Sequence, residues 1–352
     1  MQKKSRTIMK EVYDYAKNIT PGDYGGISET KFCRDYGENP APWRVGPFQI
    51  LPDMTFAKER PFEDPTGIGW ESHFIFNPSL IVKDDQLYLF YRAAPQKESL
   101  SSRIGLAVYQ EGKGWEDLSG PPILYPTEDG ETHGVEDPKV YFWNGRYYMF
   151  YQSVWQPEGE ERQRILGDTP ENWEVSCVTR LAVSNDLLHW EKKGLVLPYE
   201  ISRGWCKGAV IPRDGNGCPV KIHGKFLMFV SEGCAGRQQV GYSEDMEHWE
   251  FREQNYLSLP KEMGEICEVA CCITEQDSPD MVLDFFYRDN DGVFHAGQAH
   301  YQKDAPFQQL ELGQGGCLAW GGLTRWKGKY LVAQGWDAPK GEQRIYFYQE
   351  EK

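Results

Sequence analysis

The chain has 352 residues with 53 acidic and 38 basic side chains, so its formal charge of −15 argues against nucleic acid or an anionic membrane surface as a partner. Hydrophobic residues make up 40 % of the chain, which is enough for a substantial core. No stretch approaches the roughly 18 consecutive apolar residues that a membrane-spanning helix needs. We therefore expect a globular protein whose partner is neutral.

The nine cysteines indicate the compartment. Their number is odd, Cys271 and Cys272 are adjacent, and no CxxC spacing occurs, so neither a disulfide framework nor a metal site is expected. The N-terminal segment lacks the apolar run of a signal peptide. These features predict free, mostly buried thiols and a cytoplasmic location.

Two regions differ in pattern along the chain. Residues 1–20 have the periodicity of a short amphipathic helix that ends at Pro21-Gly22, and residues 21–70 are rich in Gly and Pro. We interpret 1–70 as a helix and a wrapping segment, and 71–352 as one repetitive domain. The helix could pack on its own domain or form a contact in a homo-oligomer.

The second region contains five similar units, each with an apolar strand, a turn and further strands. The first strands of the units are expected at Phe74–Leu80, Asp137–Phe142, Lys207–Ile211, Glu268–Ile273 and Leu318–Leu323. Two units end in related segments, SNDLLHW at Ser184–Trp190 and SEDMEHW at Ser243–Trp249. A single unit leaves a sheet edge and an apolar face uncovered, and radial closure covers both. The sequence predicts an all-β, five-bladed β-propeller with a short N-terminal helix.

Polar residues stand at the strand ends that a propeller brings together at one mouth of its channel. The predicted site residues are His73, Asn77, Arg92, Ser102, Glu136, Asp137, Lys207, Glu232, Glu268, Arg288, Asp289 and Trp336. Carboxyl groups crowded among cations suit cleavage of a glycosidic bond, because one must deliver a proton while another activates the nucleophile. We expect no metal among these residues.

The segment Gly134–Val140 (GVEDPKV) resembles the GxEDPR signature of glycoside hydrolase family 130, the β-mannoside phosphorylases and β-mannosidases. Similar neighbouring motifs follow in the family's order over about residues 70–250, at Phe76–Leu80, Tyr91–Ala93, Ser102–Ala107 and Lys207–Val210. The resemblance implies that Asp137 is the general acid and acts through a sugar hydroxyl. It also implies that Asn77, Arg92, Ser102 and Lys207 contact or shape the subsite that holds the cleaved sugar.

The chain departs from the phosphorylase members at two points. They carry a His-Arg type pair after the third-blade strand, where this chain has Ser231-Glu232, and Lys139 replaces the usual arginine of the signature. A carboxylate repels phosphate but can activate water. We therefore predict an inverting hydrolase of β-linked mannose-containing oligosaccharides, with Asp137 as proton donor and Glu232 or Glu268 as base. No cofactor is expected.

Three alternatives stay open at this point. The chain could be a β-mannoside phosphorylase that uses inorganic phosphate as co-substrate and releases mannose 1-phosphate. It could be an arabinosidase-, xylosidase- or fructosidase-like propeller in which Asp137 is a stabiliser and Glu268 the acid. It could also be a sugar-binding propeller without catalysis.

Overall fold

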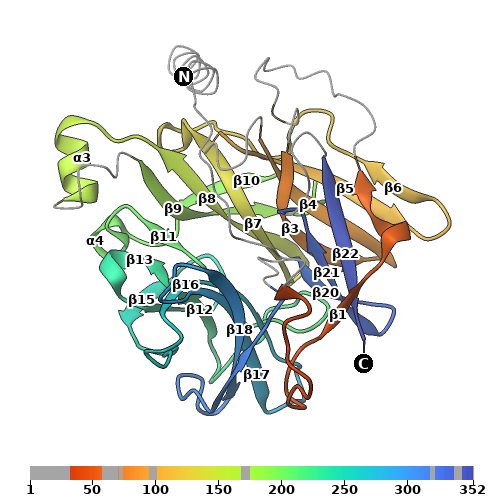
Figure 1. The fold of residues 1–352 in the computed structure, drawn as a ribbon. Coiled ribbons are helices and arrows are strands. Elements are labelled where there is room, and N and C mark those ends of the chain that lie inside the picture. Colours follow the sequence, from red (N-terminus) through yellow and green to blue (C-terminus); the bar gives the residue numbers. More distant parts are fainter. Residues whose placement is uncertain are drawn as a thin grey trace.

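The computed structural model describes residues 32–57, 70, 74–94, 101–167, 175–317, 322–336 and 343–351. The expected N-terminal helix and His73 lie outside these residues. The described part is almost entirely β-structure, and its two α-helices are α3 (Gly159–Leu166) and α4 (Tyr199–Ser202). It contains no helix long and apolar enough to cross a membrane. The strands form a five-bladed β-propeller, as predicted (Figure 1).

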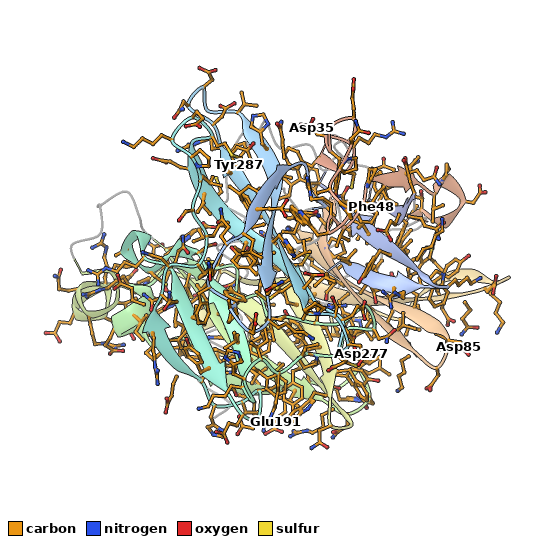
Figure 2. The ribbon with its side chains drawn as sticks, turned by 90° about the horizontal axis from the view of Figure 1, so that it is seen from below. Asp35, Phe48, Asp85, Glu191, Asp277 and Tyr287 are labelled. Atoms are coloured by element: carbon orange, nitrogen blue, oxygen red, sulfur yellow. The ribbon has the colours of Figure 1, made fainter. Side chains whose placement is uncertain are left out.

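Blades 1 and 2 are complete four-stranded antiparallel sheets in chain order. Blade 1 comprises β3 (Phe74–Lys83), β4 (Gln86–Ala94), β5 (Arg103–Gln110) and β6 (Gly114–Asp117). Blade 2 comprises β7 (Gly134–Trp143), β8 (Arg146–Trp155), β9 (Ser176–Ser184) and β10 (Glu191–Leu195). The 3-10 turn η2 (Asp129–Glu131) precedes β7. Seen from below, the labelled Asp85 and Glu191 of these blades lie at the edge of the molecule, where both are exposed (Figure 2).

Blade 3 departs from the four-stranded pattern, whereas blade 4 keeps it. Blade 3 consists of β12 (Phe226–Val230), β14 (Gln239–Ser243) and β15 (Glu250–Glu253), with β11 (Cys206–Lys207) paired to β13 (Glu232–Gly233) and η3 (Cys234–Gly236) after it. Its inner edge is only a single bridge, Val210 to Phe229, instead of the continuous strand predicted there. Blade 4 has β16 (Glu265–Ile273), β17 (Asp280–Arg288), β18 (Phe294–Gln302) and β19 (Glu311–Gln314).

Blade 5 closes the ring with strands from both ends of the chain. It consists of β20 (Leu323–Trp326), β21 (Lys329–Gln334), β22 (Arg344–Glu350), β1 (Phe48–Ile50) and β2 (Phe56–Ala57), and η1 (Pro52–Met54) lies between the last two. β1 pairs with β22 in register Phe48–Glu350, so the wrapping segment supplies an outer strand of the last blade. This pairing was not foreseen from the sequence.

Five large hydrophobic clusters lie between neighbouring blades, one at each junction. Alternate residues of a strand point to opposite faces of its sheet, so each blade contributes to the two clusters on either side. In β16, for example, Cys271 and Ile273 face blade 5 while Cys272 faces blade 3. The core is therefore a ring of sheet-to-sheet contacts around the axis.

The repeated Ser-x-Asp-x-x-His-Trp segments form the same turn in blades 2 and 3. The Ser184 hydroxyl accepts a hydrogen bond from the Leu187 amide at 2.9 Å, and Asp186 accepts one from the His189 amide at 2.8 Å. Ser243 and Asp245 accept bonds of the same lengths from Met246 and His248. These side chains hold the turn through its backbone amides, which explains the repeat without a binding role.

Arg213 joins the blades at the centre. Its guanidinium is buried and donates hydrogen bonds to the carbonyls of Leu80 in blade 1, at 3.3 Å, and Leu323 in blade 5, at 2.9 Å. A third bond, at 3.4 Å, reaches Val140 of blade 2, and its backbone amide bonds to Cys272 of blade 4 at 3.0 Å. One residue from the blade 3 loop therefore contacts all four other blades.

Candidate active site

Asn77 and Asp137 occupy equivalent positions in the inner strands of blades 1 and 2. Each precedes a proline, each lies where the register shifts, and their φ angles are +43° and +49°. Asn and Asp tolerate this left-handed backbone better than other non-glycine residues, and proline lacks the amide that a regular ladder would need. The resulting bulge turns the two polar side chains out of the regular strand pattern. Both are buried, with relative exposures of 3 % and 4 %.

Arg92 of β4 links the acidic pair of blade 2 to blade 1. Its Nη1 lies 2.8 Å from Asp137 Oδ1 and its Nη2 2.6 Å from Glu136 Oε2. Its Nε donates to the Ser102 hydroxyl at 2.6 Å, and the guanidinium lies 4.5 Å above the Phe76 ring. These partners are all buried, and the guanidinium holds Asp137 through a hydrogen bond and Glu136 through its charge.

Lys207 approaches the same carboxylates from blade 3. Its Nζ is 3.1 Å from Glu136 Oε1 and 3.3 Å from Asp137 Oδ2. Across the β11–β13 pair Lys207 is opposite Glu232, whose Oε1 accepts a hydrogen bond from Trp205 Nε1 at 2.8 Å. Glu232 and Lys207 are only partly buried, so this side of the cluster is open to solvent.

Glu268 of β16 brings a further carboxyl group from blade 4. Its Oε1 accepts a hydrogen bond from the Gly208 amide at 3.0 Å and lies 3.9 Å from the Lys139 ammonium of blade 2. The Lys139 Nζ is buried and makes no hydrogen bond within the described residues. Carboxyl groups from blades 2, 3 and 4 thus surround the cations of one site.

The carboxyl groups of the site differ in their pKa values and therefore in their protonation state near neutral pH. Burial alone would raise the pKa of Asp137, but the positive charges of Lys207, Arg92 and Lys139 outweigh it and hold that pKa far below its usual range. Burial, opposed by Lys139 and reinforced by Glu232, raises the pKa of Glu268 to about 7. Asp137 is therefore ionised near neutral pH while Glu268 is partly protonated. Two carboxyl groups with pKa values driven apart are the arrangement that acid–base catalysis needs.

Trp336 and Asn77 are two further residues of the predicted site. Trp336 packs edge-on against the Phe76 ring with centroids 5.7 Å apart, and the Arg92 guanidinium lies over the same Phe76 ring. The Asn77 Oδ1 atom is buried and accepts no hydrogen bond within the described residues.

Arg288 and Asp289 make other contacts. Arg288 is exposed at the end of β17, 3.7 Å from Glu265. Asp289 accepts hydrogen bonds from the Val293 amide and the His295 ring, both at 2.8 Å, and holds a turn. Within the described residues neither has a hydrogen bond or ion pair to Asp137, Glu232 or Glu268.

Sequence reasoning missed two members of the site. Trp205 fixes Glu232, and Lys139 of blade 2 faces Glu268 of blade 4. Trp205 lies two residues before Lys207, a spacing that places both on one side of a strand and could have identified it. Lys139 was noticed only as a substitution in a motif, because its partner comes from a strand 129 residues later.

Fold and site together define a five-bladed propeller with a buried, cation-held carboxylate centre built by blades 1 to 4. A family model described as beta-1,4-mannooligosaccharide phosphorylase, of glycoside hydrolase family 130, matches residues 54–161. The resemblance to family 130 is thereby confirmed.

Individual relatives agree with this match. The chain is 29 % identical over 185 residues to a 1,2-beta-oligomannan phosphorylase of Thermoanaerobacter sp. (strain X514), covering 51 % of this chain and 53 % of the relative. The match thus spans about half the length of that curated relative.

Two solved structures share the fold. A glycosyl hydrolase from Bacteroides ovatus has a TM-score of 0.64 at 19 % identity, covering 90 % of this chain and 96 % of the other. A second structure comes from work on glycoside hydrolases of family 130 that target β-1,2-mannosidic linkages in Candida mannan. It has a TM-score of 0.65 at 19 % identity and covers 89 % and 96 %. At this identity the likeness concerns the fold.

Proposed function

We propose that the protein is an inverting glycoside hydrolase that cleaves β-linked mannose-containing oligosaccharides. The observation that carries the proposal is the meeting of Asp137, Glu232 and Glu268 around Lys207 and Lys139. Inverting hydrolysis uses one carboxyl group as proton donor and a second as base, roughly 6.5–9.5 Å apart so that water fits between them. The buried Asn77 carbonyl oxygen and Lys139 ammonium are polar groups that sugar hydroxyls could satisfy.

The carboxylate at position 232 supports water as the nucleophile. Glu232 stands opposite Lys207, the cation on the open side of the site, and competes with any anion for it. A phosphate dianion entering there would meet Glu232 and, at higher pH, ionised Glu268. Like charges in a partly buried site repel strongly, whereas neutral water is unaffected.

Two carboxyl groups of the site are candidates for the proton donor. The resemblance assigns this role to Asp137, but Asp137 is ionised in the free protein and must receive a proton before it can donate one. Glu268, with a pKa of about 7, is the carboxyl group of the site that carries a proton near neutral pH. In the alternative assignment Glu268 donates directly and Asp137 stabilises positive charge on the sugar.

A leaving-group experiment separates these roles. An aryl β-mannoside with a dinitrophenyl leaving group departs without protonation, whereas a mannobiose needs the acid. If Asp137 is the donor, Asp137→Asn should lose activity on mannobiose but keep much of it on the aryl substrate, and replacing the base, Glu268 or Glu232, by Gln should lose both. The reverse pattern would assign the acid to Glu268. Wild-type protein that turns over neither substrate would contradict the proposed function.

A β-mannoside phosphorylase is the second candidate. It is favoured by the matched family model and by the curated relative, both described as phosphorylases. Arg92, Lys139 and Lys207 supply positive charge that could hold phosphate if Glu232 moved away or were protonated. Under this candidate, turnover requires phosphate and the product is mannose 1-phosphate.

A further inference from the structure

Blade 4 carries a row of polar side chains on the face that packs against blade 5. Cys271 of β16 is paired with Asp284 of β17, which is paired in turn with Gln298 of β18. Paired residues on adjacent strands lie side by side on one face of a sheet. All three are buried, in a junction otherwise filled by apolar residues such as Ile273 and Val332.

Cys317 reaches this row from the segment that leads into blade 5. Its Sγ lies 3.3 Å from Asp284 Oδ2, and its backbone amide donates to the same oxygen at 2.9 Å. The backbone of this segment runs close to Asp284. A Cβ atom at Gly316 would lie only 2.7 Å from the Asp284 Oδ2 atom. The Cys317 carbonyl is held by Gln334 at 2.7 Å.

We propose that Cys271, Asp284 and Cys317 form a binding site for a divalent transition metal of the zinc class, distinct from the carboxylate centre. Each residue offers one ligand atom, and these atoms lie within 4.8 Å of one another. For Zn–S and Zn–O bonds of about 2.3 and 2.0 Å, a tetrahedral site has an S···O edge of about 3.5 Å. The observed edge of 3.3 Å between Cys317 and Asp284 is close to that length.

The protein ligands of this proposal are three, and Cys33, which is buried in the same cluster as Cys271 and Cys317, is not counted among them. Two thiolates and a carboxylate are a soft donor set that selects zinc over calcium or magnesium. The spacing of the cysteines in the sequence did not indicate this site, because the packing of the sheets brings these residues together and no local motif does.

The surroundings supply an outer shell suited to such a site. Gln298 donates from Nε2 to Asp284 Oδ2 at 2.9 Å, and its Oε1 accepts from Arg44 Nε at 2.9 Å. Ligands of structural metals are commonly oriented by hydrogen bonds of this kind. The buried Arg44 guanidinium, which interacts with Asp284 and Cys317, would balance the negative charge of the metal-bound thiolates.

A metal here would join blade 4 to the segment that leads into blade 5. Cys271 and Asp284 lie in blade 4, and Cys317 lies at the entry to blade 5. The metal would therefore fasten the junction between these two blades, and binding would add directly to folding stability.

Metal titration tests the proposal. Reduced protein stripped with a chelator is titrated with Zn²⁺ by calorimetry and with Co²⁺ by absorption, where a thiolate-to-cobalt charge-transfer band reports cysteine ligands. We expect one metal per chain and loss of the band in Cys271→Ser/Cys317→Ser. Gln298→Ala should weaken binding about 10- to 100-fold, because it removes an outer-shell bond. Cys218→Ser, outside the cluster, is the matched control and should bind like wild type.

Two results would overturn the proposal. One is wild-type protein that binds no stoichiometric Zn²⁺ under these conditions, a measurement that needs no variant to fold. The other is a Co²⁺ band of unchanged strength in the double variant. If the double variant does not fold, Asp284→Asn replaces it, and unaltered affinity and spectrum in that variant would equally contradict the site.

Discussion

At the residue scale, the candidate site depends on how charge is divided among buried groups. Arg92 and Lys207 each contact both Glu136 and Asp137, so four charged side chains form one closed network. Glu268 lies outside this network, with a longer 3.9 Å contact to Lys139. Because both groups are buried, this difference in pairing keeps Asp137 ionised while Glu268 is partly protonated near neutral pH.

Replacing Asp137 by Asn should reduce turnover of a mannobiose by about 10²- to 10⁴-fold, the usual effect of losing an acid–base group. The amide is nearly the same size and can still accept a bond from Arg92, so circular dichroism and the melting temperature should show a native fold. Glu253→Gln, which alters an exposed carboxylate paired with Arg237, is the control. An Asp137→Asn activity within twofold of wild type would contradict the assignment.

Glu268 should also make stability depend on pH. Its pKa is raised from 4.5 to about 7, so the native state binds a proton that the unfolded chain has lost, and this stabilisation disappears as pH rises through 7. Glu268→Gln cannot titrate but can still accept from the Gly208 amide. Its unfolding free energy relative to wild type should rise on the order of 2 kcal/mol between about pH 5 and about pH 8. Urea unfolding at both pH values checks this, and a constant difference would contradict it.

At the element scale, the bulges explain how a regular sheet presents a reactive side chain. The Asn77-Pro78 and Asp137-Pro138 steps interrupt the inner strands of blades 1 and 2 at the same place. The motif around Asp137 was found from the sequence through its resemblance to the GxEDPR signature, whereas the bulge was not predicted, because the strand was expected to begin at Asp137. The pairing of Lys139 with Glu268 was not predicted, since it depends on how separate blades face each other. Trp205, whose partner Glu232 lies in the same blade, was missed although it stands two residues before Lys207.

Strand β1 closes the ring and should contribute strongly to stability. Phe48 is fully buried between blades 4 and 5, whereas the next residue, Gln49, is exposed. Phe48→Ala should lower the unfolding free energy by about 3–5 kcal/mol, because it leaves a cavity at the closure. Gln49→Ala should change it by less than about 0.5 kcal/mol. Denaturant unfolding measures both, and equal values would show that β1 is not part of the closure.

At the scale of the whole molecule, the blade number could be predicted because turn chemistry and strand alternation recur locally in every unit. The closure could not, since β1 and β22 are separated by nearly the whole chain and β1 is only three residues long. The central position of Arg213 could not be predicted either, because it is a single arginine in a loop without a motif. The structure brings Asp137, Glu232 and Glu268 around the cations of one site, as the propeller geometry predicts.

Arg213 should matter for stability more than any surface arginine. Arg213→Met would leave the carbonyls of Leu80 and Leu323 without this donor, at about 1–3 kcal/mol for each buried group left unsatisfied. We expect a loss of at least about 2 kcal/mol in unfolding free energy, against less than about 0.5 kcal/mol for the exposed Arg237→Met. Similar losses in both variants would show that the central hydrogen bonds are dispensable.

Product analysis with β-linked mannobioses, with and without inorganic phosphate, tests the central proposal most directly. We predict free mannose at the same rate in both conditions, released first as the inverted α-anomer. Mannose 1-phosphate formed only when phosphate is present would contradict hydrolysis and establish the phosphorylase.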